Sequence, residues 1–383
     1  MTVRSYSSTL GQADRLNISS SFSVFTARTR TINTEVIVKP RERKQKSALR
    51  QINNEQDLFQ ILKPYTVPSV KVSLWQTFNT FIPLLATYYL MYLSLSQTYW
   101  LTLGLGVLAA LFTVRLFIIQ HDCGHMSFFP SRKWNDRLGY ICSFFTMVPY
   151  YYWKRQHALH HASNGNLDHR GIGDMDVYTV DEYLAMNKWE RLRYRLYRNP
   201  LVFLLIGPWV LLFYVNRHWT DPKQYSPRDK RNVVISNITM AVTFVGLSWL
   251  IGPVAFLKIA LPVLYIAAGA GIWLFYIQHQ FEHTYWKPDA EWNFVRAAMQ
   301  GSSFYKLPKI LQWFTGNIGF HHIHHLTPGI PNYRLEKIYN ENPEFHDVFE
   351  VTILSSLKTM FLSVWDVKQQ RLISFKELKQ KYA

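Results

Sequence analysis

Long apolar stretches alternate with polar and basic segments along this chain. Four of them are about 20 residues long, the length that an α-helix needs to cross a hydrocarbon layer about 30 Å thick. They occupy residues 74–95, 101–120, 233–256 and 259–278. Because only a short connection separates the members of each pair, the pattern predicts two transmembrane helical hairpins. A buried hairpin of a soluble protein is the alternative, but its helices are usually shorter and less apolar.

Two further apolar segments, 138–152 and 201–215, are too short to span, and Gly207-Pro208 interrupts the second. We expect both to lie at the membrane interface. Two complete hairpins return the chain to its starting side, so the basic regions 121–200 and 217–231 share that side. Since Lys and Arg are enriched in cytoplasmic loops, we expect this side to be cytoplasmic.

Histidines are concentrated in three short clusters next to the predicted spans. The clusters are H-D-C-G-H at 121–125, H-A-L-H-H at 157–161 and H-H-I-H-H at 321–325. In a helix, positions i, i+3 and i+4 share one face. The candidate metal ligands on these faces are His121, His125, His157, His160, His161, His321, His324 and His325.

Eight imidazoles are more than one metal ion needs, since a catalytic zinc ion takes about three protein ligands. The number suits two ions, and a donor set of nitrogens without bridging acids favours iron among the metals that imidazole binds. At the end of the last predicted span, His279 and His283 repeat the i, i+4 spacing, and we expect at least one of them to be a ligand.

Composition and charge narrow the classes of function. The formal net charge is +17, and 48% of the residues are hydrophobic and 16% aromatic. Aromatic residues are enriched at membrane interfaces, whereas no nucleic-acid-binding module is recognisable, so nucleic acid is not an expected partner. The two cysteines, Cys123 and Cys142, do not suggest a disulfide framework.

The two ends of the chain differ from its centre. Residues 1–65 are basic, poor in acids and without an apolar run, which predicts a disordered tail; an organelle transit peptide has a similar composition. Residues 371–383 are expected to form a C-terminal tail. The acidic residues Asp174, Asp176, Asp181 and Glu182 could be carboxylates that orient ligand imidazoles, although surface charge is the commoner explanation for such residues.

Redox-active ions held by imidazoles at a membrane surface suit the activation of dioxygen for attack on an unactivated C–H bond. The acyl chains of membrane lipids are the natural substrates for a site at the helix ends. The sequence shows no dinucleotide-binding G-x-G-x-x-G unit and no haem or iron–sulfur cysteine motif, so we expect electrons from a separate carrier. The basic surface of the protein would attract an acidic electron carrier.

Two other classes of protein fit less well. An intramembrane zinc protease is suggested by H-D-x-x-H at 121–125, which loosely mimics H-E-x-x-H, but it leaves six clustered histidines unexplained. A non-catalytic metal transporter would place its ligands near the middle of the membrane. Here the clusters lie beyond the predicted spans.

The three clusters, in this order and about 30 and about 160 residues apart, resemble the histidine boxes of the integral-membrane fatty acid desaturases. The resemblance covers about residues 70–370. Within this family, the stretches 166–171, 194–200, 301–309 and 316–319 are most similar to the acyl-lipid desaturases of Bacillus, whose type member acts at the Δ5 position.

The resemblance implies a fold, a cellular location and a set of metal ligands. The fold would be an all-α membrane protein with four transmembrane helices and a cytoplasmic helical cap that carries the boxes, over residues 66–370. Its place would be the cell membrane, or an organelle membrane if the N-terminal segment is a transit peptide. The metal ligands would be the eight box histidines and His279, with His283 and His322 as additional or supporting groups.

The resemblance also implies an activity. A di-iron enzyme of this family inserts a cis double bond into the acyl chains of membrane phospholipids or glycolipids. It uses dioxygen and a ferredoxin- or flavodoxin-like electron donor. Hydroxylases and ketolases share the same boxes, so desaturation rather than oxygen insertion is expected from the resemblance alone.

Overall fold

The computed structural model describes residues 55–171, 173, 175–219 and 225–382. Most of the tail expected over residues 1–65 lies outside the described residues. Its last part forms α2 (Glu55–Leu62) and most of η1 (Lys63–Thr66). Leu58 and Leu62 are buried in a core cluster together with apolar side chains of α13 and α16, so these residues belong to the packed fold.

The four expected long helices are present. They are α3 (Val70–Ser94), α4 (Tyr99–Gly124), α11 (Pro227–Ile251) and α12 (Pro253–His279). In the described part of the chain, three of them, α4, α11 and α12, are long and apolar enough to cross a membrane by length and composition. The first half of α3 carries polar side chains such as Gln76 and Thr80, which lower its hydropathy.

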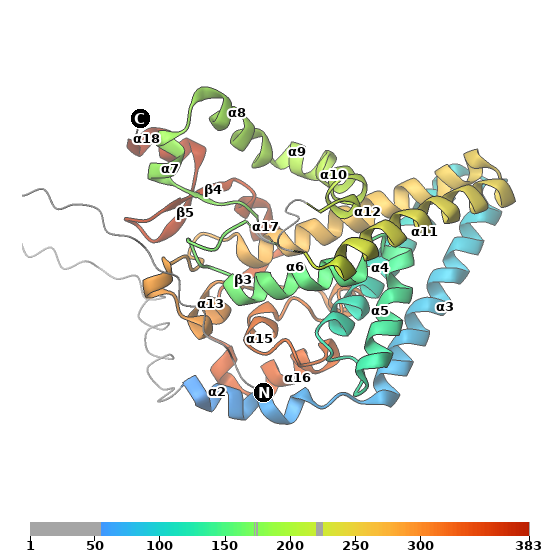
Figure 1. The fold of residues 1–383 in the computed structure, drawn as a ribbon, viewed down its shortest axis with the longest axis horizontal. Helices are drawn as coiled ribbons and strands as arrows, with labels where there is room; N and C mark the ends of the chain where they lie inside the picture. The colour runs from blue at the N-terminus through green and yellow to red at the C-terminus, as the bar shows by residue number, and fades with distance from the viewer. Residues whose placement is uncertain (1–54, 172, 174, 220–224, 383) are drawn as a thin grey trace, which may run out of the picture.

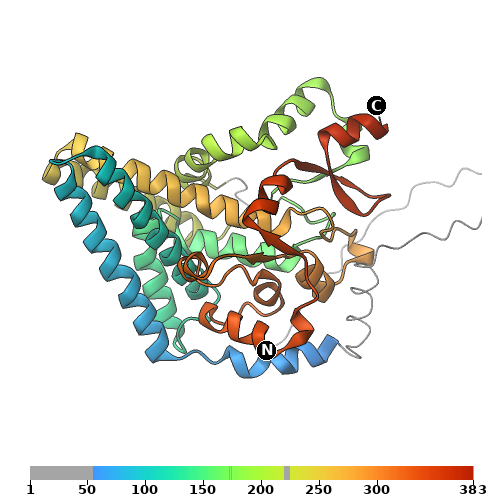
Figure 2. The same cartoon turned by 180° about the vertical axis from the view of Figure 1, so that it is seen from behind.

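The turns of the two hairpins lie together at one end of the molecule, at the right of Figure 1 and the left of Figure 2. The Tyr99 hydroxyl donates to the carbonyl of Lys258 at 3.2 Å, and Leu95 and Ile251 line the same hollow. Since both turns are at this end, the C-terminal ends of α4 and α12 meet at the opposite end. That end carries the histidines.

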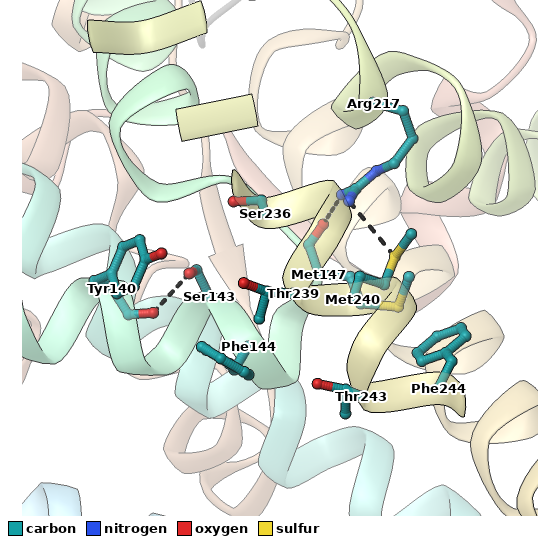
Figure 3. Close-up of a pocket in the computed structure, with 10 residues that line it drawn as sticks. All are labelled: Tyr140, Ser143, Phe144, Met147, Arg217, Ser236, Thr239, Met240, Thr243 and Phe244. Atoms are coloured by element: carbon teal, nitrogen blue, oxygen red, sulfur yellow. Dashed lines mark hydrogen bonds between the residues drawn. The ribbon is translucent and has the colours of Figure 1, made fainter. Parts of the chain in front are cut away.

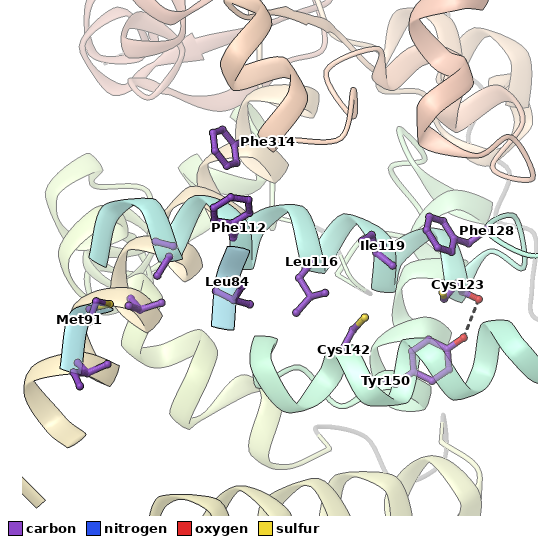
Figure 4. Packing of buried hydrophobic residues seen from close by; sticks show 14 of the residues in the cluster. Leu84, Met91, Phe112, Leu116, Ile119, Cys123, Phe128, Cys142, Tyr150 and Phe314 are labelled. Carbon is purple, nitrogen blue, oxygen red and sulfur yellow. Dashed lines mark hydrogen bonds between the residues drawn. The ribbon is translucent and has the colours of Figure 1, made fainter. Parts of the chain in front are cut away.

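Helix α4 is the centre of the packing, with α3, α5 and α12 against it (Figure 4). Leu116, Ile119 and Cys123 of α4 are fully buried and contact Leu84 of α3 and Cys142 of α5 in one core cluster. A helix that is apolar on all sides is buried in the interior of a fold, and the sequence of α4 fits that place.

Both shorter apolar segments are broken into pieces. Residues 138–152 are divided between two helices where Met147 has a left-handed φ of 57°. Residues 201–215 are divided at Gly207-Pro208. Neither segment forms one helix long enough to span. The resulting elements are α5 (Arg132–Thr146), α6 (Tyr150–Ser163), α9 (Pro200–Leu205), α10 (Gly207–Phe213) and η2 (Val215–Arg217).

The remaining elements form a cap over the ends of α4 and α12 (Figures 1 and 2). Its helices are α7 (Val180–Ala185), α8 (Lys188–Tyr197), η3 (Asp289–Glu291), α13 (Phe294–Gln300), α14 (Lys309–Phe314), α15 (His321–Leu326), α16 (Asn332–Glu341), η4 (Pro343–Phe345), α17 (Ile353–Thr359) and α18 (Phe375–Tyr382).

The cap also contains strands, so the chain is mostly helical but not all-α as predicted. Parallel pairing joins β1 to β4 and β2 to β3, and antiparallel pairing joins β4 to β5. The strands are two to five residues long, too short to show the alternating pattern from which a strand is predicted. They are β1 (Tyr178–Thr179), β2 (Phe304–Lys306), β3 (Glu350–Thr352), β4 (Leu362–Asp366) and β5 (Arg371–Ser374).

The C-terminal segment packs against this cap. Ile373 of β5 and Leu378 of α18 are buried in a cluster with Val180 of α7 and Val364 of β4. Arg371 forms ion pairs with Glu282 at 3.2 Å and with Glu377. Residues 371–382 are therefore held by the rest of the fold.

Candidate metal centre

Nine histidines from four helices converge where α4 and α12 end. The last turn of α4 supplies His121, and His125 follows as its C-cap. His279 is the last residue of α12. The short helices α6 and α15 face these ends and supply the other six, His157, His160, His161, His321, His324 and His325.

Helix α15 shows why its neighbouring histidines separate. All of its residues are buried, which is unusual for so polar a sequence. Ile323 and Leu326 belong to an apolar cluster with α13 and α16, and they fix one side of the helix. His321, His324 and His325 are on the other side, toward α4, α6 and α12.

The nine imidazoles form two groups, which we call group A and group B. Group A consists of His121, His125, His157, His161 and His324, and group B of His160, His279, His321 and His325. Within each group, one ring nitrogen from every histidine lies within 4.8 Å of the others. The groups are adjacent, because the rings of His161 and His325 stack with centroids 4.1 Å apart.

Helix geometry explains how the clusters are divided. Residues i and i+4 differ by about 40° around a helix, whereas i and i+3 differ by about 60° in the other direction. Accordingly His157 and His161 join group A while His160 joins group B. In α15, His321 and His325 join group B while His324 joins group A. Each of these clusters therefore contributes to both groups.

Contacts between ring nitrogens are short. In group A, the Nε2 atom of His161 is 3.1 Å from the Nε2 atoms of both His157 and His324. In group B, the Nε2 atom of His279 is 3.2 Å from that of His160 and 3.0 Å from that of His321. Two nitrogens that bind one metal ion, each about 2.1 Å from it and with a nitrogen–metal–nitrogen angle of about 90–110°, are about 3.0–3.4 Å apart. The observed contacts have this spacing.

Hydrogen bonding alone does not account for these contacts. A nitrogen of a neutral imidazole has either one hydrogen or one lone pair to offer, so it satisfies one partner well. The Nε2 atoms of His161 and His279 each have two nitrogen partners. In addition, the Nε2 atoms of His121 and His125 are buried without a hydrogen-bond partner. Convergence on shared metal ions would satisfy all of these atoms.

Six of the imidazoles are in the protonation state that metal binding requires. Burial, reinforced by the neighbouring imidazoles, lowers the pKa of six of these side chains well below the ordinary value for histidine, so they are neutral and keep a lone pair. These are His125, His157, His161, His321, His324 and His325.

Different groups orient the two sets of ligands. In group A, the Nδ1 atom of His121 contacts the buried carboxylate of Asp122 at 3.1 Å. The other oxygen of Asp122 accepts hydrogen bonds from the backbone and side-chain nitrogens of Asn332, at 2.7 and 2.8 Å. In group B, the Nδ1 atom of His279 is 2.9 Å from the carbonyl of Gly301. Such contacts fix the tautomer and direction of a ligand ring.

Sequence reasoning missed these orienting residues. Asp122 is next to His121 in the first cluster, and this adjacency could have indicated that its carboxylate orients the His121 ring. No local pattern points to Asn332 or Gly301. Of the acidic residues expected in this role, Glu182 instead pairs with Arg170 and caps α7, and Asp174 lies outside the described residues.

The two additional candidates lie outside both groups. His283 has a half-exposed side chain, with Glu282 as a neighbour at 3.9 Å. His322 is buried on the opposite side of α15, where its Nε2 atom is 3.1 Å from the carbonyl of Phe345. The contact of His322 therefore holds α15 to the η4 turn.

Comparison with known proteins shows the family of this chain. The fatty acid desaturase family model matches residues 98–352. A fatty acid desaturase of Bacillus subtilis is 40% identical over 327 residues, which are 85% of this chain and 92% of that protein. The chain belongs to the fatty acid desaturase family, whose members are oxidoreductases that act on fatty acyl chains. The predicted family and class of enzyme are confirmed.

Plant members of the family are more distant. An omega-3 fatty acid desaturase of Sesamum indicum is 30% identical over 57% of this chain and 50% of its own length. An sn-2 acyl-lipid omega-3 desaturase (ferredoxin) of Arabidopsis thaliana is 26% identical over 62% of this chain and 52% of its own length. The chain thus matches about half the length of these plant relatives.

Proposed function

We propose that this protein is a di-iron acyl-lipid desaturase that introduces a cis double bond into membrane-lipid acyl chains with dioxygen and external electrons. The observation that carries the proposal is the pair of adjacent imidazole groups at the joined ends of α4 and α12. A hydroxylase or ketolase on the same scaffold is the second candidate, since the same groups would serve oxygen insertion.

The ligand assignment follows the two groups. Group A would hold one iron ion and group B the other, so His279 is a ligand and His283 and His322 are not. Bound iron would supply the activation of dioxygen. The protein's own contribution is to orient the rings, through Asp122 in group A and the Gly301 carbonyl in group B, and to exclude water. Apart from His125, which is partly exposed, all the ligands are buried.

Aromatic side chains complete the wall of the site. The Trp153 ring stacks on His157 with centroids 4.6 Å apart, and Phe275 lies 5.1 Å from His160. Both rings are apolar surfaces against candidate ligand imidazoles, so they would keep water from bound metal ions and offer contact to an acyl chain. We place the reacting part of the acyl chain against this wall.

We further propose four transmembrane helices, with the cap on the cytoplasmic side of the cell membrane. Large apolar side chains of α3 and α11 point outward: Trp75 is 69% exposed, and Val245 and Trp249 are 71% and 86% exposed. A continuous apolar surface of this kind indicates contact with lipid. This supports α3 as a fourth span although polar residues lower its hydropathy.

Electrons would come from an acidic carrier of the ferredoxin or flavodoxin type. Lys154, which pairs with Asp136, lies close enough to Arg132 and Arg228 for their charges to act on it. This positive surface adjoins Trp153 and the partly exposed His125. Positive surfaces accelerate the association of negatively charged partners. The name of the Arabidopsis relative, which includes ferredoxin, supports this class of donor.

One experiment tests the proposal and its rivals together. The chain is expressed in a host that lacks desaturases, and the lipids are analysed by gas chromatography and mass spectrometry. We expect new alkenes in the wild type and none in His160→Ala or His324→Ala. Alcohols or ketones without alkenes would favour the second candidate. Iron at about two ions per purified chain is expected from the two groups, and a single zinc ion would contradict the proposal.

A further inference from the structure

A groove between α5 and α11 lies apart from both histidine groups (Figure 3). The volume that it encloses is small, about 30 Å³, so it is a shallow surface groove. Arg217 of η2 stands at one end, and Phe244 of α11 stands near the other. Along this direction the α11 hydroxyls follow the guanidinium, and Phe144 and Phe244 flank the last of them, Thr243.

The charged end is a guanidinium whose position is fixed by neutral partners. Arg217 donates to the side-chain oxygen of Asn237 at 3.0 Å and to the carbonyl of Met147. The amide of Asn237 returns a hydrogen bond to the Arg217 carbonyl at 2.8 Å. Burial lowers the pKa of Arg217 to about 10, so it remains charged at neutral pH.

This charge has no counterion within the described residues. No carboxylate there forms an ion pair with Arg217, and its Nε atom is buried without a partner. A charge removed from water without an opposite charge is costly. An anionic group at the mouth of the groove would remove that cost.

The middle of the groove carries hydroxyl groups that are also without partners. Ser236, Thr239 and Thr243 follow each other at i, i+3 and i+7, so they share one side of α11. In the described part of the chain they make no hydrogen bond. Threonines of the other long helices behave differently; Thr113, for example, donates to the carbonyl four residues earlier at 2.8 Å. The α11 hydroxyls are therefore available to a ligand.

The far end is apolar and continues onto the outside of the helix. Phe144 of α5 and Phe244 of α11 form this end of the groove. The neighbouring Val242 and Val245 are 66% and 71% exposed on a helix that is long and apolar enough to cross a membrane. A molecule that leaves the groove here enters the hydrocarbon layer.

We propose that this groove binds one molecule of membrane phospholipid, with its phosphodiester on Arg217, its glycerol esters along the α11 hydroxyls and its acyl chains over Phe244. The order of charge, hydroxyl and apolar surface matches the order of groups in that lipid. Arginine is well suited to phosphate, to which it donates charge-assisted hydrogen bonds. An uncharged glycolipid offers no anion for Arg217. The inference concerns binding and does not depend on the proposed reaction.

The test is lipid retention by the full-length chain. The protein is purified from bilayers with equal amounts of phosphatidylglycerol, phosphatidylcholine and an uncharged diacyl glucosyl glycerol with the same acyl chains. Native mass spectrometry then counts the lipids that remain bound. We expect both phospholipids to be retained over the glycolipid. Equal retention of all three, or retention of phosphatidylglycerol alone, would overturn the phosphodiester site.

Three variants locate the site. Arg217→Gln should lose the phospholipid preference by about tenfold, the usual effect of one charge-assisted hydrogen bond, and Arg217→Lys should keep part of it. The matched control is Arg137→Gln, since Arg137 is an exposed arginine of α5 whose guanidinium lies over the Trp134 ring. An unchanged preference in Arg217→Gln, or an equal loss in Arg137→Gln, would contradict the proposal.

A fourth variant tests the proposal even if Arg217→Gln does not fold. Arg217→Gln also removes contacts that hold η2 to α5 and α11. The double variant Thr239→Val/Thr243→Val leaves those contacts in place and keeps the shape of both side chains. Its phospholipid retention should fall severalfold, with an unchanged thermal unfolding temperature. Unchanged retention would overturn the proposal even if Arg217→Gln does not fold.

Discussion

The two histidine groups are neighbours, but they are built differently. Group A has five imidazoles, one of them the partly exposed His125, and its orienting contact is the carboxylate of Asp122. Group B has four imidazoles, all buried, and its orienting contact is the backbone carbonyl of Gly301. The difference suggests that group A tolerates the loss of a ligand better, while group B depends on the local course of the backbone.

The largest effects are expected from pairs of alanine substitutions that separate the groups. His160→Ala/His325→Ala removes two ligands of group B, so about one iron ion per chain should remain. His160→Ala/His161→Ala removes one imidazole from each group and leaves four in group A and three in group B, so more iron should remain than in the first pair, with activity absent in both. The iron content per chain is measured by metal analysis of the purified proteins. If the two pairs lose the same amount of iron, the division into groups A and B is wrong.

Single substitutions sharpen the same comparison. His160→Ala leaves three imidazoles in group B, whereas His324→Ala leaves four in group A. We expect no product from either, but a larger loss of iron from His160→Ala. Iron content and lipid products are measured on the same preparations. Equal iron loss would show that the fifth imidazole of group A is not a ligand.

The orienting contacts should have the next largest effect. Asp122→Asn removes the charge beside His121, and loss of such a partner costs about 10–100-fold in metal affinity or activity. The counterpart in group B is Gly301→Ala, whose new Cβ atom would lie 2.5 Å from the carbonyl of Ala297 and would displace the backbone. Iron affinity, measured by competition with a chelator, should fall in both. Asp122→Glu is the control that keeps the charge and tests placement alone.

A smaller effect, on stability rather than chemistry, is expected at His322. His322→Ala removes the partner of the buried Phe345 carbonyl and should cost about 1–3 kcal/mol of unfolding free energy. Iron content should stay at the wild-type level, because the imidazole lies outside both groups. Thermal unfolding and metal analysis are the readouts. A loss of iron without a loss of stability would make His322 a ligand.

The smallest effect is expected at His283. Its side chain is half-exposed and outside both groups, so His283→Ala should leave iron content, product and stability unchanged within about 0.5 kcal/mol. The variant also serves as the control for every histidine substitution above. A clear loss of iron would mean that the region around α12 differs from the arrangement described.

Several features could be predicted because their signals are local. The apolar lengths located the ends of α3 and α4 within four residues, but those of α11 and α12 only within six, because the turn expected between residues 256 and 259 lies at Gly252. The helical spacing of the histidines placed them on shared faces. The break at Gly207-Pro208 was predicted as well. The short strands were missed because each is paired with a segment far away in the chain, as β1 is with β4.

The contacts that orient the ligands were missed for the same reason. Asp122 and Asn332 are 210 residues apart in the sequence, and nothing in the local pattern of either predicts their hydrogen bonds. Asp181 and Glu182 were among the candidates for this orienting role. In the fold, Glu182 serves as a cap and as the partner of Arg170.

The sequence by itself determined which residues can bind metal and which helices can lie in a membrane, because residue type, helical period and apolar length are properties of short segments. Only the tertiary structure decided how nine imidazoles are divided between two groups. That division depends on the small angular differences between i+3 and i+4 on α6 and α15, and on how these helices are turned toward the ends of α4 and α12. Packing between distant segments sets those rotations.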